Sequence, residues 1–472
     1  MYEFSLSKKL SGLNIYYLAI IAVGLFATSC YYYEWYQYAQ DRPLFPEHAS
    51  QLAYNFYTYN TLNYLYESAR YEDHGVVGVG SVVNRLPDIR DTIGYAFLLG
   101  LSWKLTGTTK FYWVSFLQIC LFILSLCLLF QMLWWFYDDR TKALYGTLGI
   151  LAFLPLAFIS VQPVKDIWSF FATAALVWVI MGSIKNKLQR KHIIATAVFF
   201  AVCQWLRPTV FGVLGALVFL GLPFFYWYNK NDFKKIKQIA FWFVCANIFI
   251  FWLPWIAYNK STYNRYFVGP SGLALITSLG ERKNPWGFDA SEVGFEKAVR
   301  ERYPHTTYVN GTQEFDDLGK QLFIECFKQN PMIYVINLGY RLKKIVMRNM
   351  PLMASFWHYA QYRSKIEALK MHIQNGFVET LKFCIYVFYT RSFLLFSYIG
   401  LVLFLKRYSL LLPILVGIAV FGNCGELLSH LEDKYLMQCY GFLGIFFGFF
   451  IFWLQNIVMA QIKKRHVKKV TS

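Results

Sequence analysis

Charged residues are scarce in this chain. Asp, Glu, Lys and Arg together make up 15% of its 472 residues, whereas soluble globular proteins average about 25%. Hydrophobic residues reach 57% and aromatic residues 20%. So large an apolar excess cannot be hidden in one soluble core, because such cores stop growing at about 250–300 residues. The composition therefore excludes an ordinary soluble fold and predicts a membrane protein.

Patterns that bind metals or form disulfides are also missing. The nine cysteines include no CxxC pair and no metal-ligand spacing. Eight histidines are scattered along the chain, and none forms a His/Asp pair with ligand spacing on one helix. The sequence therefore predicts no bound metal and no other cofactor.

Basic residues collect in short clusters between apolar segments. The net charge of +19 would suggest nucleic acid in a soluble protein. Here the clusters indicate the cytosolic side instead, because cytosolic loops are enriched in Lys and Arg. They are Lys8/Lys9, Arg140/Lys142, Lys185/Lys187/Arg190/Lys191, Lys230/Lys234/Lys235/Lys237, Lys406/Arg407 and Lys463/Lys464/Arg465 with Lys468/Lys469.

All of these clusters fall on one side when the chain crosses the membrane about ten times. We therefore expect an all-α polytopic membrane protein. The first span follows Lys8 and Lys9 without a small-residue cleavage site, so we expect it to be retained. The predicted spans are 14–33, 111–137, 143–161, 167–184, 193–206, 208–228, 239–258, 383–405, 409–425 and 436–457.

One apolar stretch, Thr92–Leu105, is left out of this count because it is short and is interrupted by Lys104. We expect it to form a helix lying in the membrane interface, with Tyr95 and Trp103 as amphipathic anchors. Arg391 lies inside the eighth predicted span. Either that span begins later or Arg391 faces a polar cavity.

The predicted topology divides the chain into three parts. Residues 1–258 form an N-terminal transmembrane module with a large outward loop at 34–110. Residues 259–382 form an outward segment with the composition of a soluble protein, and residues 383–472 hold the last spans and a basic cytosolic tail. The outward segment should be small and mostly helical, with helices at Glu314–Gln329 and, amphipathic, at Met332–Met350.

Ionisable residues recur at the outer ends of the predicted spans, where charge is costly and usually functional. They occur at Asp41 to His48, at Lys165-Asp166, at Arg207-Pro208 and at His430 to Tyr435. Taken singly, Asp166 could cap the start of a helix. Arg207 could lie at a plain turn with its side chain reaching toward the membrane surface. Together these residues set carboxylates and cations at one membrane level. There a carboxylate can accept a proton from an attacking hydroxyl, and cations can hold a leaving phosphate.

In the order, spacing and sidedness of these residues, the chain resembles the GT-C superfamily of membrane glycosyltransferases. The resemblance is to the dolichyl-phosphate-mannose protein mannosyltransferase-like and aminoarabinose transferase-like branch, and it covers most of the chain. No single element of it is specific. The elements are Glu47-His-Ala-Ser-Gln-Leu-Ala53, Asp91-Thr-Ile-Gly94-Tyr95 through Leu105-Thr-Gly107, Lys165-Asp166, Arg207-Pro208, Asn330-Pro331-Met-Ile-Tyr334 through Arg341, and His430-Leu-Glu432-Asp433-Lys434-Tyr435.

The chain departs from the family in two of these elements. The last one has Lys434 where the family has Arg. The first acid of the family is usually Asp, often in an Asp-Glu pair, whereas here it is Glu47 or, as the weaker alternative, Asp41. If neither carboxylate reaches the pocket, the protein is an inactive relative.

The resemblance implies a transferase that takes a sugar from a polyprenyl phosphate at the outer face, with inversion at the anomeric carbon. It implies Glu47 as general base or as the group that orients the acceptor, with Asp166 sharing that work. Arg207 and Lys434 would bind the donor phosphate, with Arg341 and Lys165 as weaker candidates. The other implied substrate-binding residues are His430, Glu432, Tyr435 and Tyr95. Some relatives in the wider superfamily use a divalent metal, so metal dependence stays open.

The implied partners are the lipid-linked sugar donor, membrane lipids, and a glycan, lipid or protein acceptor, with no nucleic acid. The implied location is a bacterial inner membrane, with the site facing the periplasm. An O-antigen polymerase or ligase is the nearest alternative, because such enzymes also handle lipid-linked sugars outside. A lipid-linked sugar transporter or flippase is a second alternative, although the sequence lacks the internal repeats typical of transporters. A scaffold without activity is the third.

Overall fold

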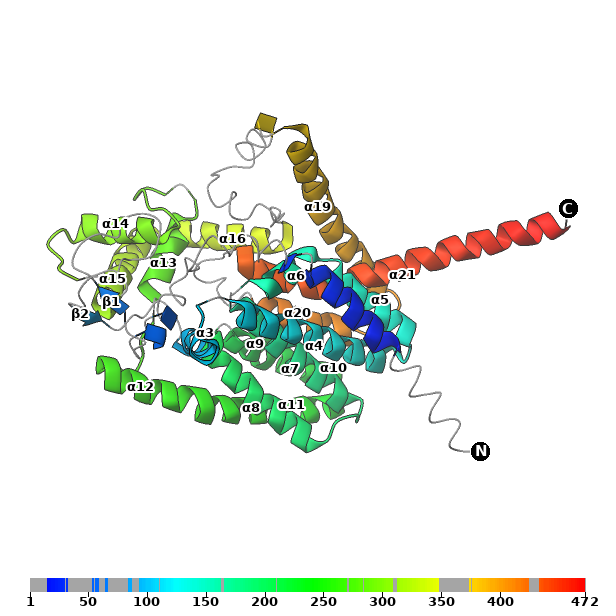
Figure 1. Ribbon diagram of the computed structural model, residues 1–472, viewed down its shortest axis with the longest axis horizontal. Coiled ribbons are helices and arrows are strands. Elements are labelled where there is room, and N and C mark those ends of the chain that lie inside the picture. The colour runs from blue at the N-terminus through cyan, green and yellow to red at the C-terminus, as the bar shows by residue number, and fades with distance from the viewer. Residues whose placement is uncertain are drawn as a thin grey trace.

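The protein, seen in a computed structural model, is built almost entirely of helices (Figure 1). A short antiparallel pair joins β1 (Tyr64–Tyr66) and β2 (Asn84–Leu86), with Tyr64 opposite Leu86. The structure describes residues 15–29, 31–32, 53–54, 56–58, 64–66, 84–86, 93–109, 111–162, 165–208, 210–269, 271–282, 284–308, 312–347, 373–374, 376–423 and 433–471.

Five helices of the described residues are long and apolar enough to cross a membrane. Several such helices fit an integral, multi-pass membrane protein, so the predicted helical membrane fold is confirmed, whereas the count of about ten spans stays a prediction. The five are α4 (Tyr112–Tyr137), α7 (Asp166–Ile184), the rod of α9 (Val210–Ala216), η1 (Leu217–Gly221) and α10 (Leu222–Tyr228), the rod of α11 (Lys230–Ala246), η2 (Asn247–Trp252) and α12 (Leu253–Tyr263), and the stretch Cys439–Lys464 of α21 (Asp433–Thr471).

The third predicted span, at 143–161, is not one straight helix. It is broken into α5 (Arg140–Leu151) and α6 (Leu154–Val161), which are bent by 65° relative to each other. Pro155 explains the break, because proline has no N–H to donate and its ring clashes with the carbonyl four residues earlier. The N–H of Leu154 instead lies 3.5 Å from the hydroxyl oxygen of Tyr389.

The remaining predicted spans lie on helices that are shorter or less apolar in the described part of the chain. They are Ile15–Ser29, α8 (Arg190–Leu206), the apolar stretch Arg391–Leu405 of α19 (Phe377–Leu405), and α20 (Leu411–Asn423). Arg391 is exposed on α19.

Close glycine contacts hold α5, α19 and α21 together. A Cβ at Gly149 of α5 would overlap the carbonyl oxygen of Gly444 in α21, and a Cβ at Gly448 would overlap that of Tyr145. A Cβ at Gly400 of α19 would likewise overlap the carbonyl oxygen of Phe446. Small residues of this kind let membrane helices approach backbone to backbone, where packing replaces the hydrophobic drive that lipid removes.

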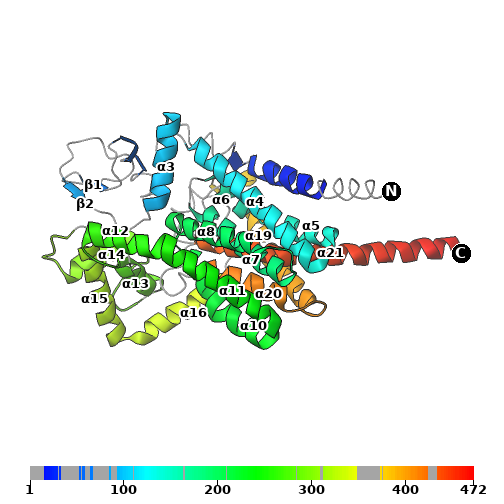
Figure 2. The same cartoon turned by 90° about the horizontal axis from the view of Figure 1, so that it is seen from below.

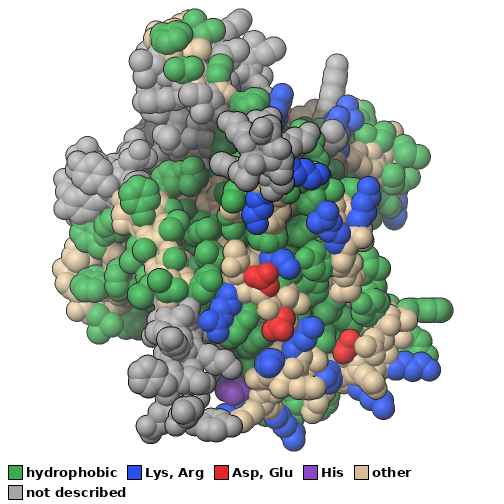
Figure 3. Space-filling model, turned by 90° about the vertical axis from the view of Figure 1, so that its right-hand side faces the viewer, with side chains coloured by type: hydrophobic (Ala, Val, Ile, Leu, Met, Phe, Trp, Pro, Cys, Tyr) green, Lys and Arg blue, Asp and Glu red, His purple; other side chains and the backbone are tan. Residues whose placement is uncertain are grey.

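The basic turns of the bundle meet at one end. Tyr137, at the end of α4, packs edge-on against Tyr408 in the turn after α19, with ring centroids 5.5 Å apart. Lys235 Nζ, in the first turns of α11, donates to the carbonyl oxygen of Ile184 at 3.0 Å. Figure 3 looks at the end from which α21 emerges, and Lys and Arg side chains are spread across it with few carboxylates among them. The described Lys and Arg side chains at this end therefore form one basic face.

The helices α13 to α16 form a second packed unit at the opposite end from the emerging α21 (Figures 1 and 2). They are α13 (Ser271–Gly280), α14 (Glu292–Arg302), α15 (Gln313–Gln329) and α16 (Pro331–Met347). Their own core includes Ile276, Phe295, Val299, Phe315 and Leu322. The predicted helices at 314–329 and from Pro331 onward are confirmed.

The helix predicted at 92–105 is also present, as α3 (Ile93–Thr106). Figure 2 shows it running across the direction of α4 and α11, as a helix in the membrane interface would. Tyr95 and Trp103 are both buried. Trp103 packs edge-on against Phe111 and Tyr57, so its ring serves as a protein contact, and the interfacial position of α3 stays a prediction.

Candidate functional site

Two residues predicted from separate motifs, Asp166 and Arg207, form a buried ion pair. Arg207 Nη2 lies 3.2 Å from Asp166 Oδ1, and the two side chains are 5% and 2% exposed. Asp166 opens α7, where a carboxylate is favoured by the helix dipole. Arg207 follows the last residue of α8, and Pro208 directly after it favours an extended rather than a helical Arg207. The ends of α7 and α8 therefore join at one charged point.

A row of uncharged polar side chains continues from this pair along α7. Ser169 and Thr173 lie one and two turns after Asp166, and both face Asn423 near the end of α20. Ser169 Oγ donates to Asn423 Oδ1 at 2.6 Å, and Asn423 Nδ2 lies 3.1 Å from Thr173 Oγ1. Asn423 Nδ2 also donates to the carbonyl oxygen of Ala419 at 2.7 Å. The end of α20 thus lies beside the start of α7.

A second polar link lies one turn before Arg207. Gln204 of α8 donates through its Nε2 to Asn247 Oδ1, the residue at which the π-helical turn η2 begins. Asn247 Nδ2 in turn donates to the carbonyl oxygen of Phe243 at 2.6 Å. Helical π-turns occur often at functional sites. Here the buried amides bind α8 to the rod of α11, η2 and α12.

The helix α4 brings further polar side chains to the level of the pair. It runs parallel to α7, because Phe122 contacts Phe170 and Gln131 Oε1 accepts from Trp178 Nε1 at 2.9 Å. These contacts set an offset of 47 or 48 residues between the two helices. Gln118 therefore lies level with Asp166. Ser115 lies one turn earlier on the same helix, and Ser115, Gln118 and Gln162, which follows α6, are all buried.

Several buried polar atoms at this level make no hydrogen bond to any described residue. They are Nε2 of Gln162, Nε1 of Trp168, Oγ of Ser115 and Oε1 of Gln204. Buried polar groups are nearly always paired, and each exception needs an explanation such as a bound ligand or water. These atoms lie on α4, α7 and α8 and at the end of α6, the helices that carry the pair of Asp166 and Arg207 or adjoin it.

Tyr95 reaches the same end of the bundle through close backbone packing. A Cβ at the neighbouring Gly94 would overlap the carbonyl oxygen of Trp205, two residues before Arg207. The start of α3 therefore lies against the end of α8. Glycine is required at position 94 by this contact, and Tyr95 is buried beside it.

The other predicted site residues differ in what the structure describes. Lys165 is half-buried next to Asp166 and precedes the first turn of α7. Lys434 and Tyr435 lie in the first turn of α21, and Cys439 Sγ, shortly after them, contacts the carbonyl oxygen of Val420 in α20 at 3.4 Å. The start of α21 therefore lies near the end of α20. Glu47, Asp41, His430 and Glu432 lie outside the described residues.

Arg341 lies in a different environment from Arg207. Its side chain is completely buried in the α13–α16 unit, where Nε lies 3.2 Å from Glu281 Oε2 and Nη2 donates to the carbonyl oxygen of Ser278 at 3.1 Å. Asn337, one turn earlier on α16, donates to the carbonyl oxygens of Ser278 and Leu279. The guanidinium therefore ties α16 to the end of α13, a contact that its sequence motif did not indicate.

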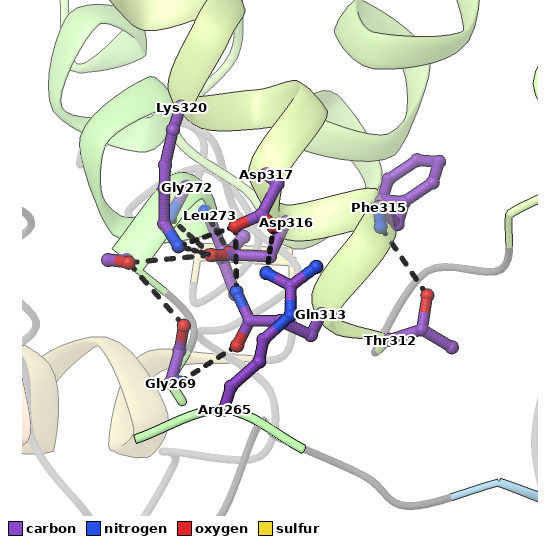
Figure 4. Close-up of polar contacts among 11 residues, drawn as sticks. Arg265, Gly269, Gly272, Leu273, Thr312, Gln313, Phe315, Asp316, Asp317 and Lys320 are labelled. Atoms are coloured by element: carbon purple, nitrogen blue, oxygen red, sulfur yellow. Dashed lines mark hydrogen bonds and ion pairs between the residues drawn. The ribbon is translucent and has the colours of Figure 1, made fainter. Parts of the chain in front are cut away.

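A polar cluster on α15, which the sequence analysis did not single out, fixes the start of α13 (Figure 4). The two Asp316 oxygens accept from the N–H groups of Gly272 and Leu273 at 2.9 and 3.0 Å. Burial raises the pKa of Asp316, against the opposing effect of these bonds and of Lys320. The bonds satisfy two of the free N–H groups that every helix start exposes. This cluster is a cap supplied by a neighbouring helix.

The adjacent Asp317 is held by cations and an amide. Burial raises the pKa of this carboxyl, but hydrogen bonds from Lys320, Arg265 and Gln313 outweigh that effect and lower its pKa below the ordinary value. Lys320 Nζ lies 2.8 Å from Asp317 Oδ1, and Arg265 forms an ion pair with the same carboxylate. The partner arginine has its pKa raised, chiefly by this hydrogen bond. The cluster is therefore internally paired.

An apolar groove of about 450 Å³ lies at the break between α5 and α6. Its lining comes from the helix Ile15–Ser29, the nearby Tyr31 and residues 148–154. The ring of Tyr31 also packs edge-on against Phe158 of α6, with centroids 5.4 Å apart. Because α6 has eight residues, it spans about 12 Å between this groove and the turn that leads to Asp166.

Among the described residues, no group of three or more His, Cys, Asp or Glu side chains is arranged to hold a metal ion. The expectation of no metal stays a prediction, because Glu47, His430 and Glu432 are not described. No protein-family model, no curated protein and no solved structure matches this chain.

Proposed function

We propose that the protein is a glycosyltransferase that moves a sugar from a polyprenyl-phosphate carrier to an acceptor hydroxyl. The observation that carries this proposal is the buried pair of Asp166 and Arg207 at the joined ends of α7 and α8. Charge buried among membrane helices is costly to keep, and it usually marks a substrate or ion site. The uncharged polar atoms around the pair suit a ligand that combines a phosphate with hydroxyl groups.

Arg207 is the group best suited to the donor phosphate. A guanidinium carries five N–H donors in a fixed fork that matches the oxygens of an anion. Bidentate binding of phosphate is typical of arginine. Lys165, next to Asp166 in the chain, and Lys434, in the first turn of α21, would add positive charge at the same end of the bundle.

The sugar would be held by the uncharged side chains. Gln162 Nε2 and Trp168 Nε1 are donors, and Gln204 Oε1 is an acceptor, each buried and without a partner among the described residues. Ser115 Oγ can both donate and accept. A site built to hydrogen-bond hydroxyl groups discriminates strongly against ligands that lack them, because its own polar groups are then left unpaired.

The reaction is a single displacement. The acceptor oxygen attacks the anomeric carbon, the bond from that carbon to the phosphate oxygen breaks, and the phosphate leaves with the electron pair. A carboxylate takes the proton of the acceptor hydroxyl. Glu47 is the proposed base and Asp166 shares that work, while Arg207 stabilises the charge that develops on the leaving phosphate. One displacement inverts the configuration at the anomeric carbon.

The carrier's hydrocarbon chain fits the apolar groove beside the break between α5 and α6. The helix Ile15–Ser29 forms one wall of this groove, and its Phe26 is largely exposed. Its volume lies within the range of about 300–1,000 Å³ common for ligand pockets. The helix α6 leads from it to the turn before Asp166, so a chain in the groove and a phosphate at Arg207 could belong to one molecule.

The proposed topology has ten spans in a bacterial inner membrane, with the ion pair facing the periplasm. It is supported by the basic face at the end from which α21 emerges (Figure 3), because basic loops stay in the cytosol. The α13–α16 unit and α3 lie toward the other end of the bundle (Figure 2). They would therefore face the periplasm.

The test is transfer of a radiolabelled sugar from a panel of polyprenyl-phosphate sugars in membranes that contain the protein. Wild type should release polyprenyl phosphate and label an acceptor, and Arg207→Gln should not. If no donor in the panel is consumed, and wild type and Arg207→Gln bind polyprenyl phosphate equally, the proposal is wrong.

A lipid-linked sugar transporter is the second candidate, and the broken span of α5 and α6 favours it. Discontinuous helices near the membrane midplane are typical of transporter binding sites. The same assay separates the two candidates when it is run in sealed vesicles. A transporter would move the labelled lipid between leaflets and leave its sugar–phosphate bond intact.

A further inference from the structure

The helix α16 buries polar side chains and exposes apolar ones. Asn337, Arg341 and Ile345 follow one another at four-residue spacing, and all three are buried. Asn337 and Arg341 bond to the end of α13 through two backbone carbonyls and the carboxylate of Glu281. The protein-facing side of α16 is therefore the polar side.

The opposite side of α16 is an apolar stripe. Helical spacing of 3.6 residues per turn brings its members to one face, away from Asn337 and Arg341. Their exposed fractions lie between 42% and 59%. The stripe, here called the outer face of α16, consists of Met332, Val335, Ile336, Leu342 and Val346. A helix on the surface of a soluble domain shows the reverse pattern, with its apolar side inward.

Both ends of α16 contact apolar parts of the protein. At its start, Tyr334 packs edge-on against Phe323 and Phe327 of α15, each with centroids 5.9 Å away. At its end, Ile345 belongs to the core of the membrane bundle, and the carbonyl oxygen of Val346 accepts from Tyr398 Oη at 2.7 Å. Tyr398 lies in the apolar stretch of α19. The end of α16 therefore lies against the bundle.

We propose that the outer face of α16 lies against the phospholipid bilayer, at the boundary of acyl chains and headgroups. In both views α16 lies between the α13–α15 helices and the bundle (Figures 1 and 2). Helices with one strongly apolar face bind at this depth, about 5–10 Å into the boundary. Lys343 is exposed near the end of the same face, where its stem can lie along apolar groups while its charge reaches the headgroups.

This contact holds the α13–α16 unit at a fixed height over the membrane. The buried bonds of Arg341 and Asn337 transmit the position of α16 to α13, and the Asp316 contacts transmit it from α13 to α15. The inference does not depend on the proposed glycosyltransferase activity, because it rests only on the surface of α16 and its attachment to the bundle.

The test is photo-crosslinking in lipid nanodiscs. The photoreactive residue p-benzoylphenylalanine replaces Ile336 in the full chain, which is reconstituted in phosphatidylethanolamine and phosphatidylglycerol and irradiated. Mass spectrometry then identifies the adducts. The matched control is the same replacement at Val293 of α14, an apolar residue that is 79% exposed and lies outside the stripe.

Phospholipid adducts should form at position 336 and be several-fold weaker at position 293. Equal lipid yields at the two positions would overturn the proposal, and so would adducts at 336 that consist of a second copy of this chain or of another protein. Replacement at Val335 serves as a repeat on the same face. Because both positions are exposed, the variants should keep the unfolding temperature of the wild type.

Discussion

Two buried ion pairs among the described residues look alike locally and differ in their surroundings. Arg207 with Asp166 in the bundle, and Arg341 with Glu281 in the α13–α16 unit, have the same separation of 3.2 Å. Arg341 also binds a backbone carbonyl, and Asn337 beside it binds two. Among the described residues, Asn337 Oδ1 is a buried atom of that network without a hydrogen-bond partner, whereas the helices around Arg207 carry several such atoms, including those of Gln162, Trp168 and Gln204.

This comparison separates a structural pair from a candidate binding pair. A network whose donors are bound to backbone carbonyls rigidifies the fold, whereas several unpartnered polar atoms on the helices around a buried charge need a ligand or water to complete their hydrogen bonds. Burial and distance alone do not distinguish the two cases. The identity of the neighbouring groups does.

The largest expected effect tests the bundle pair. Asp166→Asn should lower sugar transfer by about 10²–10⁴-fold, the usual contribution of acid–base catalysis, as measured with a radiolabelled donor. The matched change in the other pair, Glu281→Gln, should leave transfer per folded molecule unchanged. Equal losses of transfer in both variants would remove the distinction between the pairs.

The Asp166→Asn substitution also removes the carboxylate that pairs with Arg207. Folding therefore needs a separate control. The double variant Asp166→Asn/Arg207→Gln neutralises the pair and should recover most of the unfolding temperature without recovering transfer. Recovery of both would show that the pair is only structural.

The next effect tests the pair of the α13–α16 unit. Arg341→Met should lower the free energy of unfolding by about 3–5 kcal/mol, because it removes the cation that pairs with the buried carboxylate of Glu281. Adding Glu281→Leu should restore much of this loss, since replacing a whole buried pair by apolar residues is often neutral. Thermal unfolding in detergent measures both. A single variant as stable as the wild type would contradict the assigned role.

A smaller effect tests the unpartnered atoms beside Arg207. Gln162→Leu and Trp168→Phe should each weaken binding of a polyprenyl-phosphate hexose by about 1 kcal/mol, the worth of one typical hydrogen bond. Binding of unglycosylated polyprenyl phosphate should stay the same, because these donors are assigned to the sugar. Calorimetric titration of both lipids gives the comparison. Equal weakening for the two lipids would remove the assignment to the sugar.

The smallest effect is on pH dependence in the cluster of Figure 4. The pKa of Asp317 is lowered in the folded state, so its contribution to stability is present above the unfolded pKa and is lost as pH falls through the folded pKa. Near pH 6 the free energy of unfolding of the wild type should exceed that of Asp317→Asn by less than about 1 kcal/mol. The difference should shrink as the pH falls through the lowered pKa of Asp317 in the folded state.

The pKa of Asp316 is raised in the folded state. Protonation of that carboxyl therefore adds to stability as pH falls, which is opposite in sign to the effect of Asp317. The comparison of variants therefore uses one substitution at a time. Glu301→Gln is the control, since Glu301 and its partner Lys297 are both more than half exposed and 3.8 Å apart. A pH-dependent difference of the same size in this control would contradict the assignment to Asp317.

The sequence by itself determined the membrane class, the main helices and the residues of the bundle pair. Long uncharged apolar segments are stable only in lipid or in an apolar core, so α4 and α7 were predictable from composition. Thr312 and Pro331 mark the starts of α15 and α16 for local reasons, as a cap and as a residue without an N–H. Asp166 and Arg207 were marked by their cost at the ends of apolar segments.

Only the tertiary structure decided which charged residues pair with each other and which polar groups surround each pair. Asp166 and Arg207 face each other because α7 and α8 are antiparallel, and Arg341 was assigned to α13 by the packing of α16. Gln118, Gln162 and Asn423 were missed, although an uncharged amide inside an apolar run is a signal that could have found them. Local residue patterns carry helix propensity and burial, whereas pairing between distant helices depends on register and crossing, which no short segment encodes.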